Sequence, residues 1–257
     1  MKIAICGKGG SGKSTITALL ATKLAQQNIN VLVIDADESN TGLHRLLGVK
    51  APVNLLDHIG GKKAFKQKLN QQFPRADQEL FGQSLPVSSL SSDYTAAKDG
   101  VQLVAVGKIQ DAGEGCACPM GVLSKMVLSK LVTGPNDVVL IDTEAGIEHF
   151  GRGLDENCDM IIGVVDPSYE SFLLAERITG MVQHTGAELH FILNKADSRS
   201  ETAMRKHVAD ETIAAVVVND DILFSASLEG TPLETDMPAI NPVCEMIINR
   251  LSRRQTQ

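Results

Sequence analysis

Residues 3–15 of the chain read IAICGKGGSGKST. A short apolar run ends at Gly7, a glycine-rich turn follows, and apolar residues then recur at helical spacing from Ile16 to Leu24. A strand, a turn and a helix in this order, with the glycines and Lys13 at these positions, match the phosphate loop G-x-x-x-x-G-K-[ST]. The alternative, a glycine-rich turn without a ligand, is disfavoured because both the spacing and the flanking pattern are correct. The sequence therefore predicts a P-loop nucleoside triphosphatase.

Each residue type in this loop has a chemical reason. Glycines let backbone N–H groups converge on phosphate oxygens, and the N-terminus of the following helix adds positive potential. Lys13 is predicted to reach the β- and γ-phosphates, and the Ser14 hydroxyl is predicted to bind Mg²⁺. The predicted nucleotide-binding residues of the loop are Gly9, Gly10, Ser11, Gly12, Lys13, Ser14 and Thr15.

Length and composition exclude several classes of protein. The 257 residues suit one large α/β domain, which we expect to span 1–257 with an irregular insertion at about 50–100. Lysines at 62–68 indicate a solvated helix face or a docking patch for an acidic partner. The net charge of −7 argues against broad nucleic-acid binding, and no apolar run is long enough to span a bilayer. The five cysteines and the expected lack of a signal peptide predict a cytoplasmic protein.

Two uninterrupted apolar runs, 31–35 and 138–142, each end in an acidic residue. Such runs are typical of strands buried on both faces of a parallel sheet. An acid at the carboxyl end of such a strand, beside a phosphate loop, is placed to meet Mg²⁺ or water. Asp37, just beyond the first run, and Asp142 are therefore candidate magnesium ligands. The alternative for Asp37 is the N-cap of a helix.

Further strands are predicted at the apolar runs 101–107, 160–166, 189–193 and 213–218. The last helix, around 242–253, has an apolar stripe that favours a core face over a membrane-binding face. Strands that alternate with helical patterns predict a three-layer α/β fold with a doubly wound, mostly parallel sheet.

The second landmark is the segment 115–119, Gly-Cys-Ala-Cys-Pro. Side chains at i and i+2 of an extended segment lie on one face, so Cys116 and Cys118 can point the same way. Two thiolates are too few for a closed tetrahedral metal site, but a twofold dimer supplies four. A metal site shared between two chains is therefore predicted, and a pair of packing thiols is the alternative. Pro119 suits the first position of a helix, and the apolar positions Val122, Met126 and Leu131 suggest that a helix follows.

A second lysine, Lys8, makes the phosphate loop unusual. The pattern K-G-G-x-G-K-[ST] resembles the deviant phosphate loop of the family that includes septum-site ATPases, partition ATPases and the nitrogenase iron protein. The resemblance implies that Lys8 reaches across a homodimer to the partner's nucleotide, and that Asp37 positions the attacking water. It implies Lys8, Lys13 and Asp37 as the catalytic residues and Gly146 as a donor to the γ-phosphate. A solvated surface lysine is the alternative for Lys8.

A narrower resemblance comes from residues 144–153, EAGIEHFGRG, together with the Cys-x-Cys-Pro segment. Both resemble the CooC family of nickel-insertion ATPases that mature carbon monoxide dehydrogenase. The resemblance implies an ATP-dependent metallochaperone that uses ATP and Mg²⁺ and carries Ni²⁺ or Zn²⁺. It also implies a homodimer with carbon monoxide dehydrogenase or acetyl-CoA synthase as the client. His149 is either a metal ligand or a structural residue beside the site.

The segment Asn194-Lys195-Ala196-Asp197 resembles the N-K-x-D element that contacts a nucleotide base. In the family, the asparagine contacts adenine, whereas in GTPases the aspartate binds guanine. Asn194 and Lys195 are therefore predicted nucleotide-binding residues, and the choice of adenine rests on the resemblance. Relatives often have a proline just after the last strand, where this chain has Val218-Asn219.

Two other functions remain open at this stage. Four thiolates from two chains also suit a [4Fe–4S] cluster, which predicts an ATP-dependent reductase like the nitrogenase iron protein. A partition or division ATPase is the other alternative, and it predicts binding to DNA or membrane. Neither nucleic acid nor membrane is the expected partner, because neither would explain the two cysteines.

Overall fold

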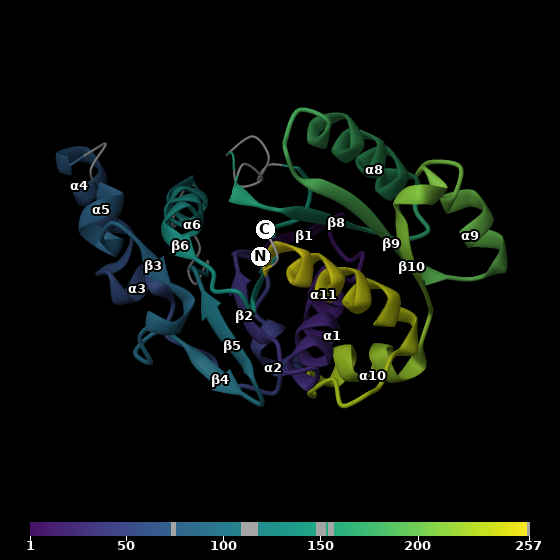
Figure 1. Cartoon of the computed structure of the whole chain (residues 1–257), viewed down its shortest axis with the longest axis horizontal. Coiled ribbons are helices and arrows are strands. Elements are labelled where there is room, and N and C mark those ends of the chain that lie inside the picture. Colours follow the sequence, from purple (N-terminus) through teal and green to yellow (C-terminus); the bar gives the residue numbers. More distant parts are fainter. Residues whose placement is uncertain (73–75, 109–117, 148–152, 154–156, 256–257) are drawn as a thin grey trace.

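The computed structural model describes residues 1–72, 76–108, 118–147, 153 and 157–255, and of residues 71, 72, 118 and 255 only the backbone. A central eight-stranded sheet lies between two layers of helices (Figure 1). The strands are, in spatial order, β10 (Ile213–Val218), β9 (Glu188–Ala196), β8 (Met160–Val165), β1 (Lys2–Gly7), β7 (Asp137–Asp142), β2 (Asn30–Asp35), β5 (Val101–Ala105) and β4 (Ala96–Lys98).

All neighbouring strands of this sheet run parallel except β4, which pairs antiparallel with β5. The chain winds outward from β1 in both directions, so the loops after β1, β2 and β7 meet at one edge. Ligands of doubly wound sheets bind outside the carboxyl ends of the strands, at the point where the winding reverses. The predicted three-layer, doubly wound, mostly parallel fold is confirmed.

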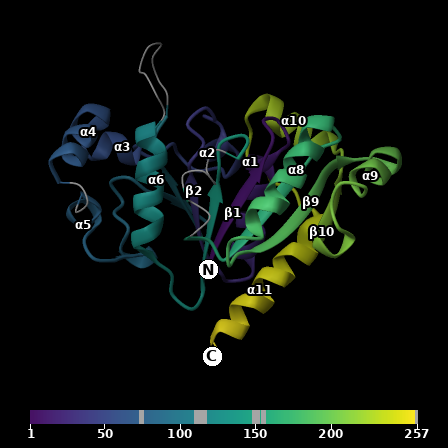
Figure 2. The ribbon, with the colours of Figure 1, turned by 90° about the horizontal axis from the view of Figure 1, so that it is seen from above.

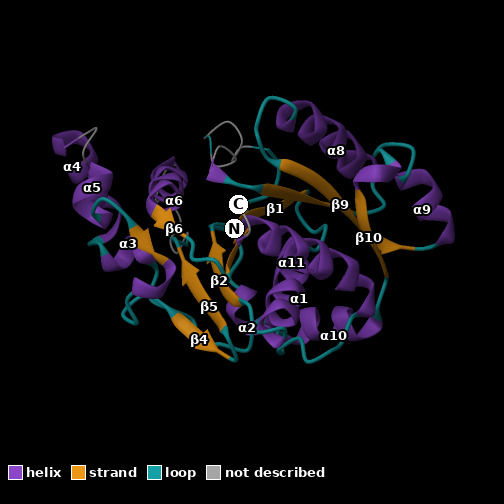
Figure 3. Cartoon of the chain, viewed as in Figure 1, coloured by secondary structure: helices purple, strands orange, loops and turns teal. Residues whose placement is uncertain are grey.

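Each helix layer covers one hydrophobic core. Alternate residues of a strand point to opposite faces, so Ile3 and Ile5 belong to one core whereas Ala4 and Cys6 belong to the other. The first core is covered by α1 (Lys13–Gln26), α2 (Leu43–Leu46), α10 (Asp221–Glu229) and α11 (Asn241–Gln255). The second is covered by α3 (Leu55–His58), α4 (Gly61–Gln72), α6 (Cys118–Lys130), α8 (Tyr169–Val182) and α9 (Ser198–Met204) (Figures 2 and 3).

The region 50–100 lies at the β4 side of the sheet, where α4 and α5 (Ala76–Phe81) form one end of the molecule in Figure 1. The lysines at 62–68 lie on α4, so their prediction as part of a helix is confirmed. Short elements complete the fold: β3 (Leu85–Pro86), which pairs with β6 (Leu131–Val132), and the 3₁₀ turns η1 (Val87–Ser89), η3 (Asp210–Thr212) and η4 (Pro238–Ile240).

The predicted helix after Pro119 is present as α6. Its buried apolar residues include Met120, Leu123, Val127 and Leu128, whereas Val122 is 41% exposed. Leu131 is buried but lies in β6, just beyond the helix.

The last helix, α11, buries its apolar stripe against the first core. Val243, Ile247 and Leu251 are almost fully buried, so the predicted core face is confirmed. In the described part of the chain, no helix has both the length and the apolar character needed to cross a membrane.

Ile247→Ala is expected to lower the free energy of unfolding by about 2–4 kcal/mol, because it leaves a cavity in the first core. Urea unfolding measures this change. Asn249→Ala, at an exposed position of the same helix, is the control and is expected to change stability by less than about 0.5 kcal/mol. An Ile247→Ala variant of unchanged stability that loses binding to vesicles would favour a membrane-binding helix instead.

Candidate functional site

The phosphate loop leaves β1 at Gly7 and enters α1 at Lys13. Gly10 and Gly12 have φ of +79° and +100°, a region that residues with a Cβ rarely adopt. A Cβ on Gly12 would also lie 2.3 Å from Nδ2 of Asn194, so only glycine fits there. Lys13 is buried and donates to the carbonyl of Lys8 at 3.3 Å. The loop therefore has the backbone conformation that its sequence pattern predicts.

The loop forms one wall of a cavity of about 510 Å³. Lys8, Ser11 and Asp142 are not among its lining residues, and Ser11 and Asp142 are fully buried. The predicted site residues that line the cavity are Gly9, Gly10, Gly12, Lys13, Ser14, Thr15, Asp37, Asn194 and Lys195. The structure thus brings together segments that are up to about 180 residues apart in the sequence.

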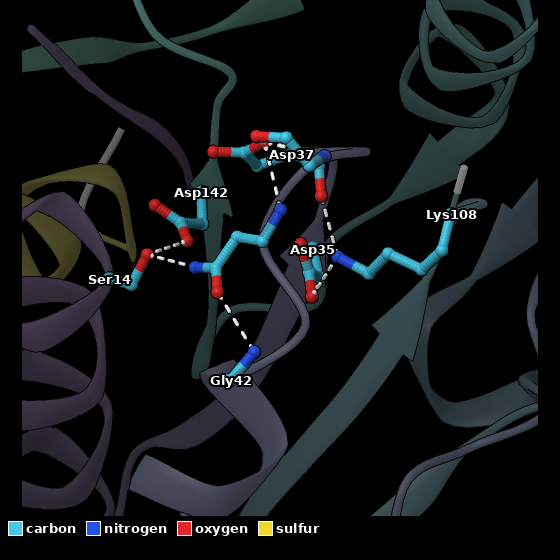
Figure 4. A network of polar contacts seen from close by, with 8 residues as sticks. Ser14, Asp35, Asp37, Gly42, Lys108 and Asp142 are labelled. Carbon is cyan, nitrogen blue, oxygen red and sulfur yellow. Dashed lines mark hydrogen bonds and ion pairs between the residues drawn. The ribbon is translucent and has the colours of Figure 1, made fainter. Parts of the chain in front are cut away.

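Ser14 and Asp142 form the polar centre of the site. The Ser14 hydroxyl donates to Oδ2 of Asp142 at 2.6 Å, and Nδ2 of Asn40 donates to the Ser14 oxygen at 2.6 Å (Figure 4). Asp142 is fully buried, and its Oδ1 has no hydrogen-bond partner among the described residues. Burial, together with the nearby charge of Asp35, raises the pKa of Asp142 to about 7.

These oxygen atoms fit a magnesium ion. Mg²⁺ prefers carboxylate, hydroxyl and water oxygens, and the site offers the Ser14 oxygen and the unpartnered Oδ1 of Asp142. Oδ1 of Asp35 is also buried and has no hydrogen-bond partner in the described part of the chain, and burial raises the pKa of Asp35 to about 6. A cation beside these groups would favour their ionised forms. The donor set therefore suits a divalent cation bound close to Ser14.

Asp37 lies in the loop between β2 and α2 and faces the cavity wall. Its Oδ1 accepts hydrogen bonds from the backbone N–H of Ser39 at 2.9 Å and of Asn40 at 3.2 Å. The alternative that Asp37 caps a helix is wrong, because α2 begins at Leu43 after Gly42. The carboxylate instead fixes a turn of the loop that also carries Asn40 to Ser14.

A lysine that sequence analysis missed contacts the same loop. Nζ of Lys108, just after β5, lies 2.6 Å from Oδ2 of Asp35 and donates to the carbonyl of Asp37 at 2.5 Å (Figure 4). No sequence motif predicts this residue, because its contacts depend on the pairing of β2 with β5 in the sheet.

Asn194 and Lys195 both hold the phosphate loop. Nδ2 of Asn194 donates to the carbonyl of Ser11 at 2.8 Å, and Nζ of Lys195 donates to the carbonyl of Gly10 at 2.7 Å. Asp197, by contrast, caps α9: its Oδ1 accepts from two backbone N–H groups of the first turn. The N-K-x-D segment therefore lies against the cavity with its aspartate engaged elsewhere.

The far wall of the cavity is apolar. Val218, Leu223 and Phe224 line it together with Asn219, so the segment that replaces the family's proline does reach the cavity. Phe224 is 63% exposed in the free chain although it is a large aromatic residue. Sequence analysis did not predict Phe224, because its place on the cavity depends on the position of α10 in the fold.

Lys8 is engaged within its own chain. Its Nζ lies 3.5 Å from Oδ2 of Asp166, at the end of β8, and the lysine side chain is 33% exposed. The backbone N–H of Gly146 donates to the carbonyl of Gly7 at 3.2 Å, so in this structure it is not available to a phosphate. Both groups would have to exchange these partners to meet a nucleotide.

The predicted metal site cannot be located. Cys116 and His149 lie outside the described residues, and of Cys118 only the backbone at the start of α6 is described. Within the described ranges, no group of three or more His, Cys, Asp or Glu side chains is arranged to hold a metal ion. The remaining cysteines, Cys6, Cys158 and Cys244, are buried in the cores.

Comparison with known proteins agrees with this geometry. Residues 2–233 match the family model for the CobQ/CobB/MinD/ParA nucleotide-binding domain. An uncharacterized ATP-binding protein of Methanocaldococcus jannaschii is 43% identical over 247 residues, which cover 96% of this chain and 99% of the relative. The carbon monoxide dehydrogenase accessory protein CooC of Rhodospirillum rubrum is 32% identical over 222 residues, 77% of this chain and 80% of the relative.

Among solved structures, the septum site-determining protein MinD of Pyrococcus horikoshii, complexed with Mg-ADP, has a TM-score of 0.66 to this chain. The alignment covers 96% of this chain and 95% of that one at 21% identity, so it supports the fold alone. The family model spans nearly the whole chain and includes the phosphate loop. This chain is therefore an ATPase of the CobQ/CobB/MinD/ParA nucleotide-binding family.

Proposed function

We propose that this ATPase is a metallochaperone that forms a nucleotide-dependent homodimer and holds Ni²⁺ or Zn²⁺ at a site shared by Cys116 and Cys118 of two chains. The client is carbon monoxide dehydrogenase or acetyl-CoA synthase. The observation that carries the proposal is the 32% identity to a carbon monoxide dehydrogenase accessory protein over 77% of the chain. The Cys-x-Cys-Pro segment supports it, because thiolates are suitable ligands for either metal.

The described residues support ATP binding with Mg²⁺ at the cavity. Lys13 is placed at the start of α1 to bind the β- and γ-phosphates, and Ser14 and Asp142 supply oxygen atoms for the ion. When bound, Mg²⁺ neutralises charge on the phosphates. Asp37, in the loop that faces the cavity, positions the attacking water in this proposal.

The geometry favours adenine over guanine. Asp197, which would bind guanine in an N-K-x-D element, already accepts two backbone hydrogen bonds at the start of α9. Nδ2 of Asn194 gives one of its two N–H groups to the carbonyl of Ser11, and in this proposal its Oδ1 acceptor contacts the base. An acceptor suits the exocyclic amino group of adenine.

A dimer gives Lys8 its role. In the free chain Lys8 pairs with Asp166, and the pair is partly exposed, so its contribution to stability is small. A phosphate group of a nucleotide in the second chain would offer Lys8 a more highly charged partner. We infer that nucleotide binding exchanges the Asp166 contact for one across the dimer.

The central test is the metal content and mass of the protein with and without ATP. We expect one metal ion per two chains in the nucleotide-bound dimer, measured by mass spectrometry and metal analysis. Cys116→Ser/Cys118→Ser should lose the metal but keep ATP binding, because the phosphate loop is unchanged. Lys8→Ala should bind ATP yet remain monomeric.

Other outcomes of this test would overturn the proposal. Four irons per dimer with a brown colour would indicate an iron–sulfur reductase. A metal-free native protein that binds DNA or vesicles only with ATP would indicate a positioning ATPase. Unchanged metal content in the double cysteine variant would place the metal elsewhere in the chain.

Asp142→Asn is expected to abolish magnesium-dependent hydrolysis while it stabilises the nucleotide-free protein. Burial raises the folded-state pKa of Asp142 from 3.8 to about 7, so between these pH values the unfolded chain loses the proton that the folded chain keeps, and the native protein loses stability as the pH rises. The advantage of the variant over the native protein should therefore grow by about 1–3 kcal/mol between pH 5 and pH 8. Unfolding by urea at both pH values measures it.

Ser14→Ala is the matched control for this experiment. It also removes an oxygen from the proposed magnesium site, but it leaves the Asp142 carboxyl buried without its hydroxyl partner. It should lose hydrolysis without any gain in stability. A destabilised Asp142→Asn protein at pH 8, or one that retains hydrolysis, would contradict this assignment.

Phe224→Ala is expected to weaken ATP binding by about 5- to 100-fold, because an aromatic face on the cavity wall can cover the base. Binding of inorganic triphosphate, which has no base, should be unchanged. Titration calorimetry with both ligands measures the difference. Ile222→Ala is the control, since Ile222 is 62% exposed on the same helix but does not line the cavity. Equal losses for ATP and triphosphate would contradict a base-binding role.

A further inference from the structure

Lys108 is an enclosed cation that the proposed chemistry does not yet use. It follows β5, and its side chain is only 12% exposed. Its ammonium group contacts the Asp35 carboxylate at 2.6 Å and the carbonyl of Asp37 at 2.5 Å (Figure 4). Removing a lysine from water is costly, so the position calls for a reason beyond a surface ion pair.

The end of the β2–β5 pairing places Lys108 beside the main chain of Asp37. The β2–β5 ladder ends at the pair Asp35 and Ala105, with one further bond from Val106 N–H to the Asp35 carbonyl. Lys108 lies two residues beyond Val106, and its side chain donates to the main-chain carbonyl of Asp37. The direction in which the Asp37 carboxylate is presented therefore depends on this contact.

The loop after β2 is held on two sides. On one side, Asn40 donates to Ser14 beneath the phosphate loop. On the other side, Lys108 holds the carbonyl of Asp37. The Asp37 carboxylate organises the turn between these two attachments. Both attachments are polar contacts between different elements, so each can set the loop's position relative to the bound nucleotide.

Two other roles for Lys108 fit less well. It does not line the cavity, so it is not placed to bind phosphate directly. Its pairing with Asp35 alone is weak evidence for a stabilising role, because buried ion pairs often contribute little net stability. The contact to the Asp37 carbonyl is left unexplained by either role.

We propose that Lys108 is a positioning residue for ATP hydrolysis: it fixes the main chain at Asp37 so that the carboxylate meets the attacking water. The proposal rests on the proposed role of Asp37. A shift of about 1 Å in a group near the chemistry can cost about 100-fold in rate. Phosphate binding is unaffected, because the residues of the phosphate loop do not contact Lys108 in the described structure.

The test compares Lys108→Met with Lys108→Arg by steady-state ATP hydrolysis. Lys108→Met should lower kcat by about 10- to 100-fold and change KM for ATP by less than about threefold. Lys108→Arg keeps the charge and the donors and should recover most of kcat. Lys130→Met is the control, since the Lys130 side chain is 15% exposed and its Nζ lies 2.9 Å from Oδ2 of Asp77, and neither residue lines the cavity. It should leave both constants unchanged.

A double variant separates positioning from simple charge balance. Asp35→Asn/Lys108→Met removes the carboxylate that Lys108→Met would leave buried without a partner. If Lys108 positions Asp37, the double variant regains thermal stability while kcat stays low. If kcat returns to the native value, the lysine only neutralises Asp35, and the proposal is wrong.

Asp37→Asn, measured alongside, distinguishes this proposal from the one on which it rests. Loss of hydrolysis in Asp37→Asn with a native rate in Lys108→Met overturns the positioning role alone. A native rate in Asp37→Asn overturns the proposed role of Asp37. A native protein that hydrolyses no ATP would overturn the assignment of an ATPase to the cavity.

Discussion

Two carboxylates, Asp35 and Asp142, lie at paired positions on the adjacent parallel strands β2 and β7. Both are buried, and desolvation raises the pKa of each carboxyl group. The charge of Asp35 raises the pKa of Asp142 further. Two such groups cannot both ionise at low cost unless cations compensate them. The polar part of the site agrees with this constraint: Lys108 contacts Asp35, and the Ser14 hydroxyl donates to Asp142.

The sheet topology brings the two carboxylates together and also places the residues that surround them at the same edge. Parallel strands bring their carboxyl ends to one edge, so the loops after β1, β2 and β7 must meet there. The phosphate loop gives backbone donors and Lys13, and the loop after β2 gives Asp37. Strand β9 adds Asn194, which supports the phosphate loop from the other side. Binding residues far apart in the chain therefore share one cavity.

The sequence predicted the parts of the site that depend on local patterns. The phosphate loop and the acid-ended strands are recognisable because buried parallel strands are uninterrupted apolar runs. Lys108, the Asp166 partner of Lys8, and Phe224 were not predicted, since each depends on which elements become neighbours in three dimensions. Which apolar residues of α6 are buried also depends on packing: Met120 and Leu123 are buried, whereas Val122 is exposed.

The loop after β2 has unequal attachments on its two sides. If the Ser14 oxygen binds Mg²⁺ with one of its two lone pairs, the other can still accept from Asn40, but the cation draws electron density from the oxygen and weakens that hydrogen bond. The Lys108 contact lies on the opposite side and does not compete with the nucleotide. Loop movement on nucleotide binding would then pivot about Lys108.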